Sequence, residues 1–502
     1  MKAETHEPAG QDGLSHMKPI TRREMLAATT AAGSFSFFPA RVLGRGGATP
    51  PSERLNIAMI GAGGRGAISL ENLKDQNIVA LCDVDWRTDS RSQFPAGKVA
   101  AQYPSAKRYD DYRKMLEEMD KSIDAVVVAT PDHSHAHASI AAMRMKKHVY
   151  CEKPLAHDMH EVRAMMAAAK KYKVITQTGN QGHSNYDVRS IVEWVRAGAI
   201  GSVKAVHLFE GAGRRPAAAP ARAGTVDWQG QYNFTKVLSD EVPVPAQLNW
   251  DLWLGPAPSR RYNPAYLPLA WRRWIDFGTG VMGDFVCHYL DPVAWSLNLD
   301  LPETIEADTD AAYDPKTNRQ TYPNYSLLRC AYPARGKQPP VNVTWYLNSP
   351  ERPPRPEGWK ADEKLPDETG GGIIVGSQGS ILFGKVFHGA TARTTPGLVR
   401  LYPDELDKSF KRPDMTIPRL QGEGDLGGHW LEWVECIKAG KPAGSHFDYG
   451  GMLSKSAVLG NIAQRTKGKI LRFNAKDEKF TNDDDANKMF QRPYRDGWKL
   501  PA

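Results

Sequence analysis

A short apolar run that leads into closely spaced glycines constrains the fold of this chain more than any other feature. Residues Leu55–Ile60 are apolar and rich in strand-forming types, and a helical pattern of apolar residues occupies Ile68–Leu73. Between them lie Gly61, Ala62, Gly63, Gly64, Arg65 and Gly66, which form a GxGxxG sequence. Glycines in such a turn let the main chain approach a pyrophosphate, which then lies at the N-terminus of the following helix. The segment predicts a dinucleotide-binding βα unit in which these six residues contact the cofactor.

A carboxylate at the end of the next predicted strand strengthens this prediction. The strand covers Ile78–Cys82, and Asp83 follows it, 22 positions after Gly61. An acidic residue at this place accepts hydrogen bonds from the adenosine ribose, and its charge repels the 2′-phosphate of NADP. We therefore predict NAD as the cofactor, with NADP less favoured. Asp85 could take the same role, and Arg87 could instead accommodate a 2′-phosphate, so both alternatives stay open at this point.

Strands and helices continue to alternate up to residue 179, which predicts a doubly wound parallel sheet. Residues 49–179 are thus expected to form a Rossmann domain. Ligands of such sheets bind at the carboxyl ends of the strands. The candidate cofactor contacts at these ends are Thr130, Pro131, His135, Glu152, Lys153 and Asn180.

Three closely spaced histidines, His133, His135 and His137, raise the question of a metal site. No cysteine and no second cluster of ligands accompanies them. A turn into a helix, with Asp132 or Ser134 as its cap, explains the segment as well. We predict no metal.

Residues 1–48 have the pattern of an export signal followed by a linker. Arg22 and Arg23 precede a weakly apolar stretch over residues 26–40, which is too short to span a membrane. We interpret this segment as a twin-arginine signal, which predicts a periplasmic or otherwise exported protein. Because no nicotinamide pool exists outside the inner membrane, we expect the cofactor to be bound tightly and regenerated in place.

The composition argues against two kinds of partner. Lysine and arginine together number 65 against 57 aspartates and glutamates, and no basic stripe with interleaved aromatic residues occurs, so we predict no nucleic-acid binding. No apolar run is long enough for membrane insertion. The five cysteines are irregularly spaced and indicate neither a disulfide framework nor a zinc site.

Four motifs, taken in order, resemble those of the Gfo/Idh/MocA family, named after glucose–fructose oxidoreductase and inositol dehydrogenase. They are Ala58–Gly66 (AMIGAGGRG), Ala129–His133 (ATPDH), Glu152–Pro154 (EKP) and Gly283–His288 (GDFVCH). The resemblance runs from about Leu55 to Trp498 and extends to the exported subgroup with a twin-arginine signal.

The resemblance implies catalytic roles for three residues. In the family, the lysine that corresponds to Lys153 lies at the nicotinamide and handles the hydroxyl proton, for which a partly desolvated lysine is suited. Asp284 and His288 are four apart and therefore share one face of a helix. The family places this pair beside the substrate carbinol, so that His288 would share or perform proton abstraction while Asp284 orients it or the sugar.

For residues 180–502 the resemblance implies an α+β domain with a large, mostly antiparallel open sheet. One face of such a sheet covers the active site, and the other commonly forms oligomers, so we expect a homodimer or homotetramer. His183 and Arg272 are candidate sugar contacts beside Lys153, Asp284 and His288. Irregular stretches near 211–248 and 350–425, the second around one hairpin, are expected to be lids or substrate loops. Residues Gly427–Arg465 have a helical pattern.

These observations predict an NAD(P)-dependent oxidoreductase that acts on CH–OH groups of carbohydrates. A ring hydroxyl of a sugar or glycoside would be oxidised to a ketone, with the cofactor recycled internally. One alternative is a redox-neutral NAD-dependent glycosidase of the family-109 α-N-acetylgalactosaminidase type. The Glu-Lys-Pro lysine is not kept there, so Lys153 favours the oxidoreductase. The other alternative, a non-catalytic sugar-binding protein, leaves the set Lys153, Asp284 and His288 unexplained.

Overall fold

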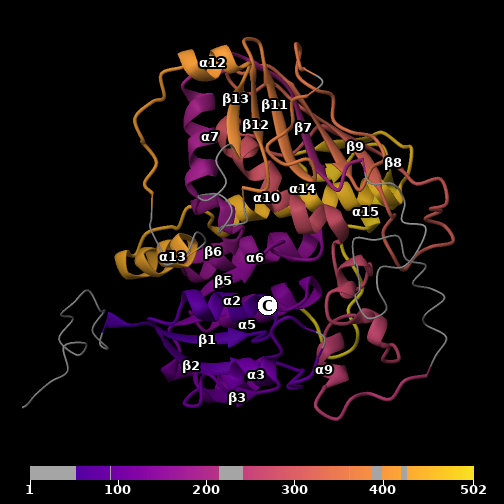
Figure 1. Cartoon of the computed structure of the whole chain (residues 1–502). Helices are drawn as coiled ribbons and strands as arrows, with labels where there is room; N and C mark the ends of the chain where they lie inside the picture. Colours follow the sequence, from indigo (N-terminus) through magenta and orange to yellow (C-terminus); the bar gives the residue numbers. More distant parts are fainter. Residues whose placement is uncertain are drawn as a thin grey trace, which may run out of the picture. The chain divides into compact units, whose positions relative to one another are not determined.

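The computed structural model describes residues 53–501 except 91, 214–240, 361, 387–397 and 420–426. The predicted export signal therefore lies outside the described residues. Residues 55–502 form one unit, which holds two sheets (Figure 1).

The first sheet has six parallel strands in the order β3-β2-β1-β4-β5-β6. Their bounds are β1 Asn56–Ile60, β2 Asn77–Cys82, β3 Lys107–Tyr109, β4 Ala125–Val128, β5 His148–Glu152 and β6 Thr176–Gly179. The connecting helices are α2 Arg65–Asn72, α3 Ala96–Ala100, α4 Tyr112–Glu118, α5 His135–Arg144 and α6 Met159–Tyr172. This is the strand order of a doubly wound Rossmann fold, which confirms the predicted fold of this region.

The second sheet has nine strands in the order β13-β12-β11-β7-β10-β9-β8-β14-β15. Their bounds are β7 Val203–Glu210, β8 Thr304–Thr309, β9 Ser326–Tyr332, β10 Val341–Leu347, β11 Gly370–Gly376, β12 Ser380–Phe383, β13 Val399–Tyr402, β14 Leu471–Asn474 and β15 Lys479–Phe480. Among the described strand pairs of this sheet only β7–β10 is parallel, so the predicted mostly antiparallel sheet is confirmed.

Three helices cover one face of the second sheet, namely α7 Tyr186–Arg196, α10 Gly280–Leu297 and α14 Phe447–Arg465 (Figure 1). Alternate strand residues such as Leu208, Leu328 and Trp345 point into this large apolar core. The opposite face carries a smaller cluster that includes Leu327 and Tyr346, and Leu365 from the segment 350–369 packs on it. Part of that face is thus covered by the chain itself.

Two expectations for the second half need correction. Residues 350–425 are less irregular than predicted, because strands β11 to β13 and helix α12 Asp404–Ser409 lie within them and complete the sheet. The helical pattern of Gly427–Arg465 is two helices, α13 Gly427–Ala439 and α14, with Gly440 in a left-handed conformation between them. Strand β11 contains four glycines, and β12 and β13 have only four residues each, so their alternation was too weak to be recognised.

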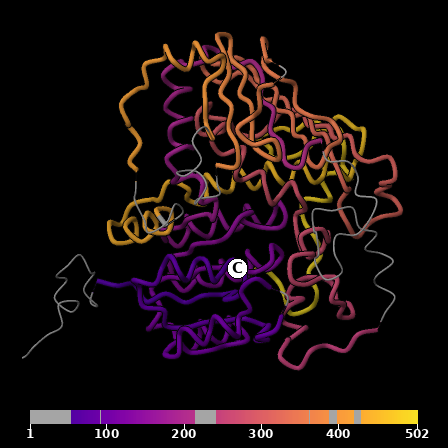
Figure 2. Tube along the Cα trace, in the orientation of Figure 1, coloured from indigo at the N-terminus to yellow at the C-terminus, as the bar shows by residue number. Residues whose placement is uncertain are grey.

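The end of the chain returns to the first domain. Trp430 of α13 stacks on Tyr150 of β5, with ring centroids 5.7 Å apart. Beyond α15 Asp484–Lys488, the tail runs beside the segment around residues 250–280 (yellow in Figure 2). There the main-chain oxygen of Trp498 contacts Nε2 of His137 in α5, at 3.0 Å. Among the described residues, no helix is long and apolar enough to cross a membrane.

Candidate active site

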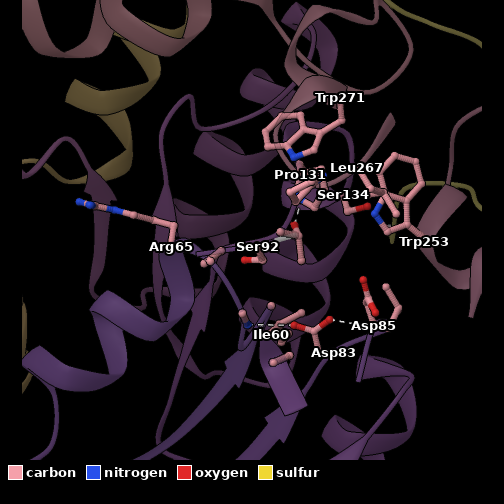
Figure 3. A pocket seen from close by; sticks show the side chains of 18 of the residues that line it. Ile60, Arg65, Asp83, Asp85, Ser92, Pro131, Ser134, Trp253, Leu267 and Trp271 are labelled. Atoms are coloured by element: carbon pink, nitrogen blue, oxygen red, sulfur yellow. Dashed lines mark hydrogen bonds between the residues drawn. The ribbon is translucent and has the colours of Figure 1, made fainter. Parts of the chain in front are cut away.

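A cavity of about 1070 Å³ lies at the carboxyl edge of the first sheet. Its floor is the glycine-rich turn and the loops after β2, β4 and β5, and its opposite wall comes from residues 245–278, here called the roof segment. Figure 3 shows Asp83 and Asp85 at one end, with Trp253, Leu267 and Trp271 of the roof segment across from them.

The roof segment is attached to the first domain by main-chain hydrogen bonds. The N–H of Asn249 donates to the carbonyl of Val84 at 2.8 Å, and the N–H of Trp86 donates to the carbonyl of Gln247 at 3.0 Å. At the other end of the segment, the N–H of His133 donates to the carbonyl of Phe277 at 3.2 Å. The cavity is therefore bounded by both domains.

The glycine-rich turn has the geometry that a bound dinucleotide requires. Gly61 has φ of +87°, and a Cβ there would lie 2.7 Å from the carbonyl oxygen of Ala129. A Cβ on Gly66 would lie 1.9 Å from the carbonyl oxygen of Gly61, so this glycine allows the close packing of α2 on β1. Gly61, Gly63, Gly64 and Arg65 line the cavity, whereas Ala62 and Gly66 do not and serve the packing behind it.

Asp83 lies where a ribose carboxylate is expected. One oxygen accepts the main-chain N–H of Gly63 at 3.0 Å, and the other accepts that of Asp85 at 2.9 Å. Burial raises the pKa of Asp83 to about 6, although these two hydrogen bonds act in the opposite direction. Each oxygen keeps a second lone pair for a ribose hydroxyl. The glycine turn and this carboxylate together fit NAD.

Lys153 lies at the other end of the cavity, immediately after β5. Its Nζ donates to the main-chain oxygen of Asp284 at 2.8 Å and forms an ion pair with the carboxylate of the same residue. Arg272 contacts that carboxylate too, with Nε at 3.2 Å. Burial alone would raise the pKa of Asp284, but Lys153 and Arg272 hold it below its ordinary value. One anion therefore holds two cations in place.

His288 lies one helical turn after Asp284 in α10, and its buried side chain lines the cavity. Arg272 comes from the roof segment, where its guanidinium stacks on Trp271 at 4.3 Å from the ring centroid. The structure thus brings together four of the five residues predicted to contact substrate: Lys153, His288 and Arg272 line the cavity, and Asp284 contacts Lys153 and Arg272 without being among the lining residues.

The loops after β4 and β5 are linked through His135. Its ring nitrogens lie 2.8 Å from the carbonyl oxygen of Thr130 and 2.9 Å from that of Pro154. Burial lowers the pKa of this imidazole, but Cys151 and Asp132 outweigh that effect and raise it to about 10. A protonated ring donates both hydrogen bonds and so fixes the turn that carries Lys153. Thr130, Pro131 and Glu152, which are predicted to contact the cofactor, also line the cavity.

The other two histidines of this segment point elsewhere. The ring of His133 contacts the carbonyl oxygen of Trp253 at 2.9 Å, and that of His137 contacts the tail. Burial lowers the pKa of His133 to about 3. Among the described residues no group of three or more histidine, cysteine, aspartate or glutamate side chains is arranged to hold a metal.

His183 and Asn180, predicted to contact sugar and cofactor, lie away from this cavity and need correction. His183 is buried, stacks on Trp295 with ring centroids 4.1 Å apart, and pairs with Asp291 through Nδ1 at 2.9 Å. Asn180 donates to the second oxygen of Asp291 at 3.0 Å and accepts from Ser445 at 2.5 Å. Both are core residues beneath α10, because the chain turns inward after β6.

The sequence did not single out several residues that line the cavity. Trp253 and Tyr262 of the roof segment, Trp498 of the tail, and Gln181 all do so. Gln181 donates to Glu152 at 2.8 Å. For Trp253 and Tyr262 the only sequence signal is the aromatic density of residues 250–277, which does not distinguish a cavity wall from a core.

Comparison with known proteins assigns both domains. Residues 55–180 match the family profile described as "Oxidoreductase family, NAD-binding Rossmann fold" of Gfo/Idh/MocA proteins, and residues 218–325 match its "C-terminal alpha/beta domain". A myo-inositol 2-dehydrogenase of Thermotoga maritima is 32% identical over 169 residues, which are 33% of this chain and 47% of that protein. A glycosyl hydrolase family 109 protein of Stenotrophomonas maltophilia is 28% identical over 206 residues, 39% of this chain and 42% of that protein.

The match therefore spans about half the length of these curated relatives. Solved structures agree over a longer range at low identity, which shows the fold alone. An oxidoreductase domain protein of Kribbella flavida has a TM-score of 0.52 at 19% identity and covers 82% of this chain and 97% of its own. An aldose–aldose oxidoreductase of Caulobacter crescentus in complex with glycerol has a TM-score of 0.50 at 16% identity, covering 84% and 100%. Two regions of the chain, residues 55–180 and 218–325, are thus similar to the two domains of Gfo/Idh/MocA oxidoreductases.

Proposed function

We propose that the protein is an NAD-dependent oxidoreductase that oxidises a ring hydroxyl of a sugar or glycoside to a ketone. The observation that carries this proposal is the cluster of Lys153, Asp284, His288 and Arg272 at one end of a dinucleotide cavity. It combines groups that can move a proton with groups that can orient hydroxyls, in a site largely shielded from water.

The four side chains have separable tasks in this reaction. A dinucleotide held by the glycine turn and Asp83 would supply the hydride acceptor for the carbinol carbon. Lys153 and His288 line the same end of the cavity and are the groups that could take the hydroxyl proton, Lys153 only in its uncharged form. Asp284 holds Lys153 and Arg272 in position, and Arg272 donates to the sugar oxygens. Trp271, stacked under Arg272, offers an apolar face to the ring.

The enclosed cavity supports tight binding and internal recycling of the cofactor. The roof segment and Trp498 line the wall opposite the cofactor floor, so a second carbonyl substrate could take the hydride before the cofactor leaves. We expect nucleotide to remain with the protein during purification.

A redox-neutral glycosidase is the second candidate function. It is favoured by the similarity to the family-109 glycosyl hydrolase. In such a cycle, oxidation acidifies a neighbouring C–H, the glycosidic bond is eliminated, water adds, and the hydride returns to the same sugar. The presence of Lys153 in the reacting end of the cavity supports the net oxidoreductase instead.

One experiment separates these functions. The protein is purified with its native nucleotide and mixed with a panel of glycosides and free sugars, while nicotinamide absorbance and products are followed together. A ketosugar with reduced nicotinamide supports the oxidoreductase, and free sugar without a net absorbance change supports the glycosidase. Saturable sugar binding without any product would support the non-catalytic sugar-binding protein instead.

We also propose export through the twin-arginine pathway and assembly into a homodimer or homotetramer. Arg22 and Arg23, outside the described residues, support export. Fractionation of cells that express the full chain and an Arg22→Lys, Arg23→Lys variant tests it, and retention of the wild type in the cytoplasm contradicts it. Light scattering of the purified protein gives the assembly state. Segment 350–369 leaves only part of the outer sheet face for contact between subunits.

A further inference from the structure

The loop after β2 contains an ion pair whose geometry bears on cofactor choice. Nε of Arg87 donates to Oδ1 of Asp85 at 2.7 Å, and Nη2 donates to Oδ2 at 2.7 Å. This is the two-point arrangement in which a guanidinium matches a carboxylate or a phosphate. Both residues line the nucleotide end of the cavity, two and four positions after Asp83.

The pair is held from several sides. The N–H of Asp85 donates to Asp83 at 2.9 Å, and the main chain of Asp85 forms a β-bridge with Leu248 of the roof segment. Tyr262 interacts with the guanidinium of Arg87. The side chains are only 20% and 19% exposed, so the pair is better shielded than an ordinary surface ion pair.

A 2′-phosphate at this end of a Rossmann cavity is normally met by an arginine near the ribose carboxylate. The edge of Arg87 that would meet it is occupied by Asp85. A phosphate would also face two carboxylates, those of Asp83 and Asp85, whose charge repels it.

We propose that Asp85 is a specificity-determining residue, which makes the cavity selective for NAD by holding Arg87 in this two-point pair. Arg87 could bind a phosphate, but its pairing with Asp85 prevents this. This inference rests on the proposed function only in that the cavity binds a nicotinamide dinucleotide. It adds a residue that decides which of the two dinucleotides is accepted.

The test measures dinucleotide binding and needs no substrate. The full chain is prepared free of nucleotide by mild unfolding and refolding, and Kd values for NAD⁺ and NADP⁺ are measured by calorimetry. The variants are Asp85→Ser, Asp85→Ser with Arg87→Gln, and Asp89→Ser. The last is the matched control, because Asp89 lines the same cavity and its removal takes away the same charge without opening the pair.

Asp85→Ser is expected to bind NADP⁺ at least about tenfold more tightly than the wild type, because a released guanidinium makes charge-assisted hydrogen bonds. Its Kd for NAD⁺ is expected to stay within about threefold. The gain should disappear in the double variant and be absent in Asp89→Ser.

Three results would overturn the proposal. They are a wild type that binds NADP⁺ as tightly as NAD⁺, a gain in Asp89→Ser equal to that in Asp85→Ser, and a gain that survives Arg87→Gln. In each case the chain still binds dinucleotide, so the proposed oxidoreductase stands. A folded wild type that binds neither dinucleotide would remove the proposed function itself, and this inference with it.

Discussion

The two ends of the cavity are built in different ways. At the nucleotide end the predicted cofactor contacts lie in one continuous stretch, in which the glycine turn after β1 and the loop after β2 contact each other through Asp83. Leu248 and Tyr262 of the roof segment pack against this stretch. The reacting end joins Lys153 to Asp284, a residue 131 positions away, and to Arg272 of the roof segment. The comparison indicates that binding of the cofactor depends on local structure, whereas the proposed chemistry depends on how the two domains meet.

Lys153→Met should have the largest effect, because it should impair the reacting end of the cavity and leave the nucleotide end intact. We expect kcat/KM to fall by about 10²–10⁴-fold, the range for loss of an acid–base group, with NAD affinity little changed. Steady-state kinetics on the substrate found by the panel, together with calorimetry, measure the two effects. Lys147→Met is the matched control, because Lys147 is equally buried but pairs with Asp120. Full activity of Lys153→Met would end the catalytic assignment.

Asp284→Asn should weaken the join between the domains. It leaves Lys153 and Arg272 without their shared anion, which is expected to cost about 3 kcal/mol of unfolding free energy. Urea unfolding measures this. Asp308→Asn, in the exposed pair with Arg329, should cost less than about 1 kcal/mol. Because the folded pKa of Asp284 is lowered, its contribution is present above the ordinary value of 3.8 and is lost as the pH falls below it. Equal costs for the two variants would contradict this account.

A pH titration sharpens the description of the nucleotide end. The pKa of Asp83 is raised to about 6, so its carboxylate is charged above that pH and takes up a proton below it. The affinity for NAD should therefore fall by up to about tenfold per pH unit below pH 6 and be level above it. Binding isotherms between pH 5 and 8, about the range in which folded proteins are most stable, measure this slope. Asp83→Asn should bind NAD weakly and show no such pH dependence. If the pH dependence persists in this variant, another group takes up the proton.

Arg495→Ala should have the smallest effect. Arg495 of the tail donates to the carbonyl of Gly255 at 2.8 Å and to that of Asp251 at 2.7 Å, which steadies the roof segment from outside. Losing these bonds should speed release of NADH a fewfold, as a fluorescence chase would record. Lys499→Ala, at an exposed position of the same tail, is the control. Equal rates of NADH release from the two variants would show that the contacts of Arg495 do not contribute to cofactor retention.

The sequence was most informative where a pattern and its structure are local. The six parallel strands follow from short apolar runs between glycines and helices, and the placement of Asp83 follows from strand length alone. The pairing of Lys153 with Asp284 could be expected only through the family resemblance, since no local pattern relates residues so far apart. His183 and Asn180 were misplaced because helices α10 and α14 supply their partners, Asp291 and Tyr449, from elsewhere in the chain.

The roof segment shows a different limit. Its aromatic residues could be read as core or as cavity wall, and only the main-chain bonds between Asn249 and Val84 decide where it lies. Backbone hydrogen bonds between irregular segments cannot be predicted from residue type, because every residue except proline carries both the N–H donor and the carbonyl acceptor.

The contact between His137 and the carbonyl of Trp498 joins residues 361 positions apart. A ribosome makes the β-strands of the first sheet long before it reaches Trp498, and that sheet can form as soon as its own segment emerges. The cavity wall, however, also includes Trp498, which is translated long after the first sheet. The cavity as described is therefore complete only after Trp498 has been translated, and a chain that stops before that residue would lack this part of the wall.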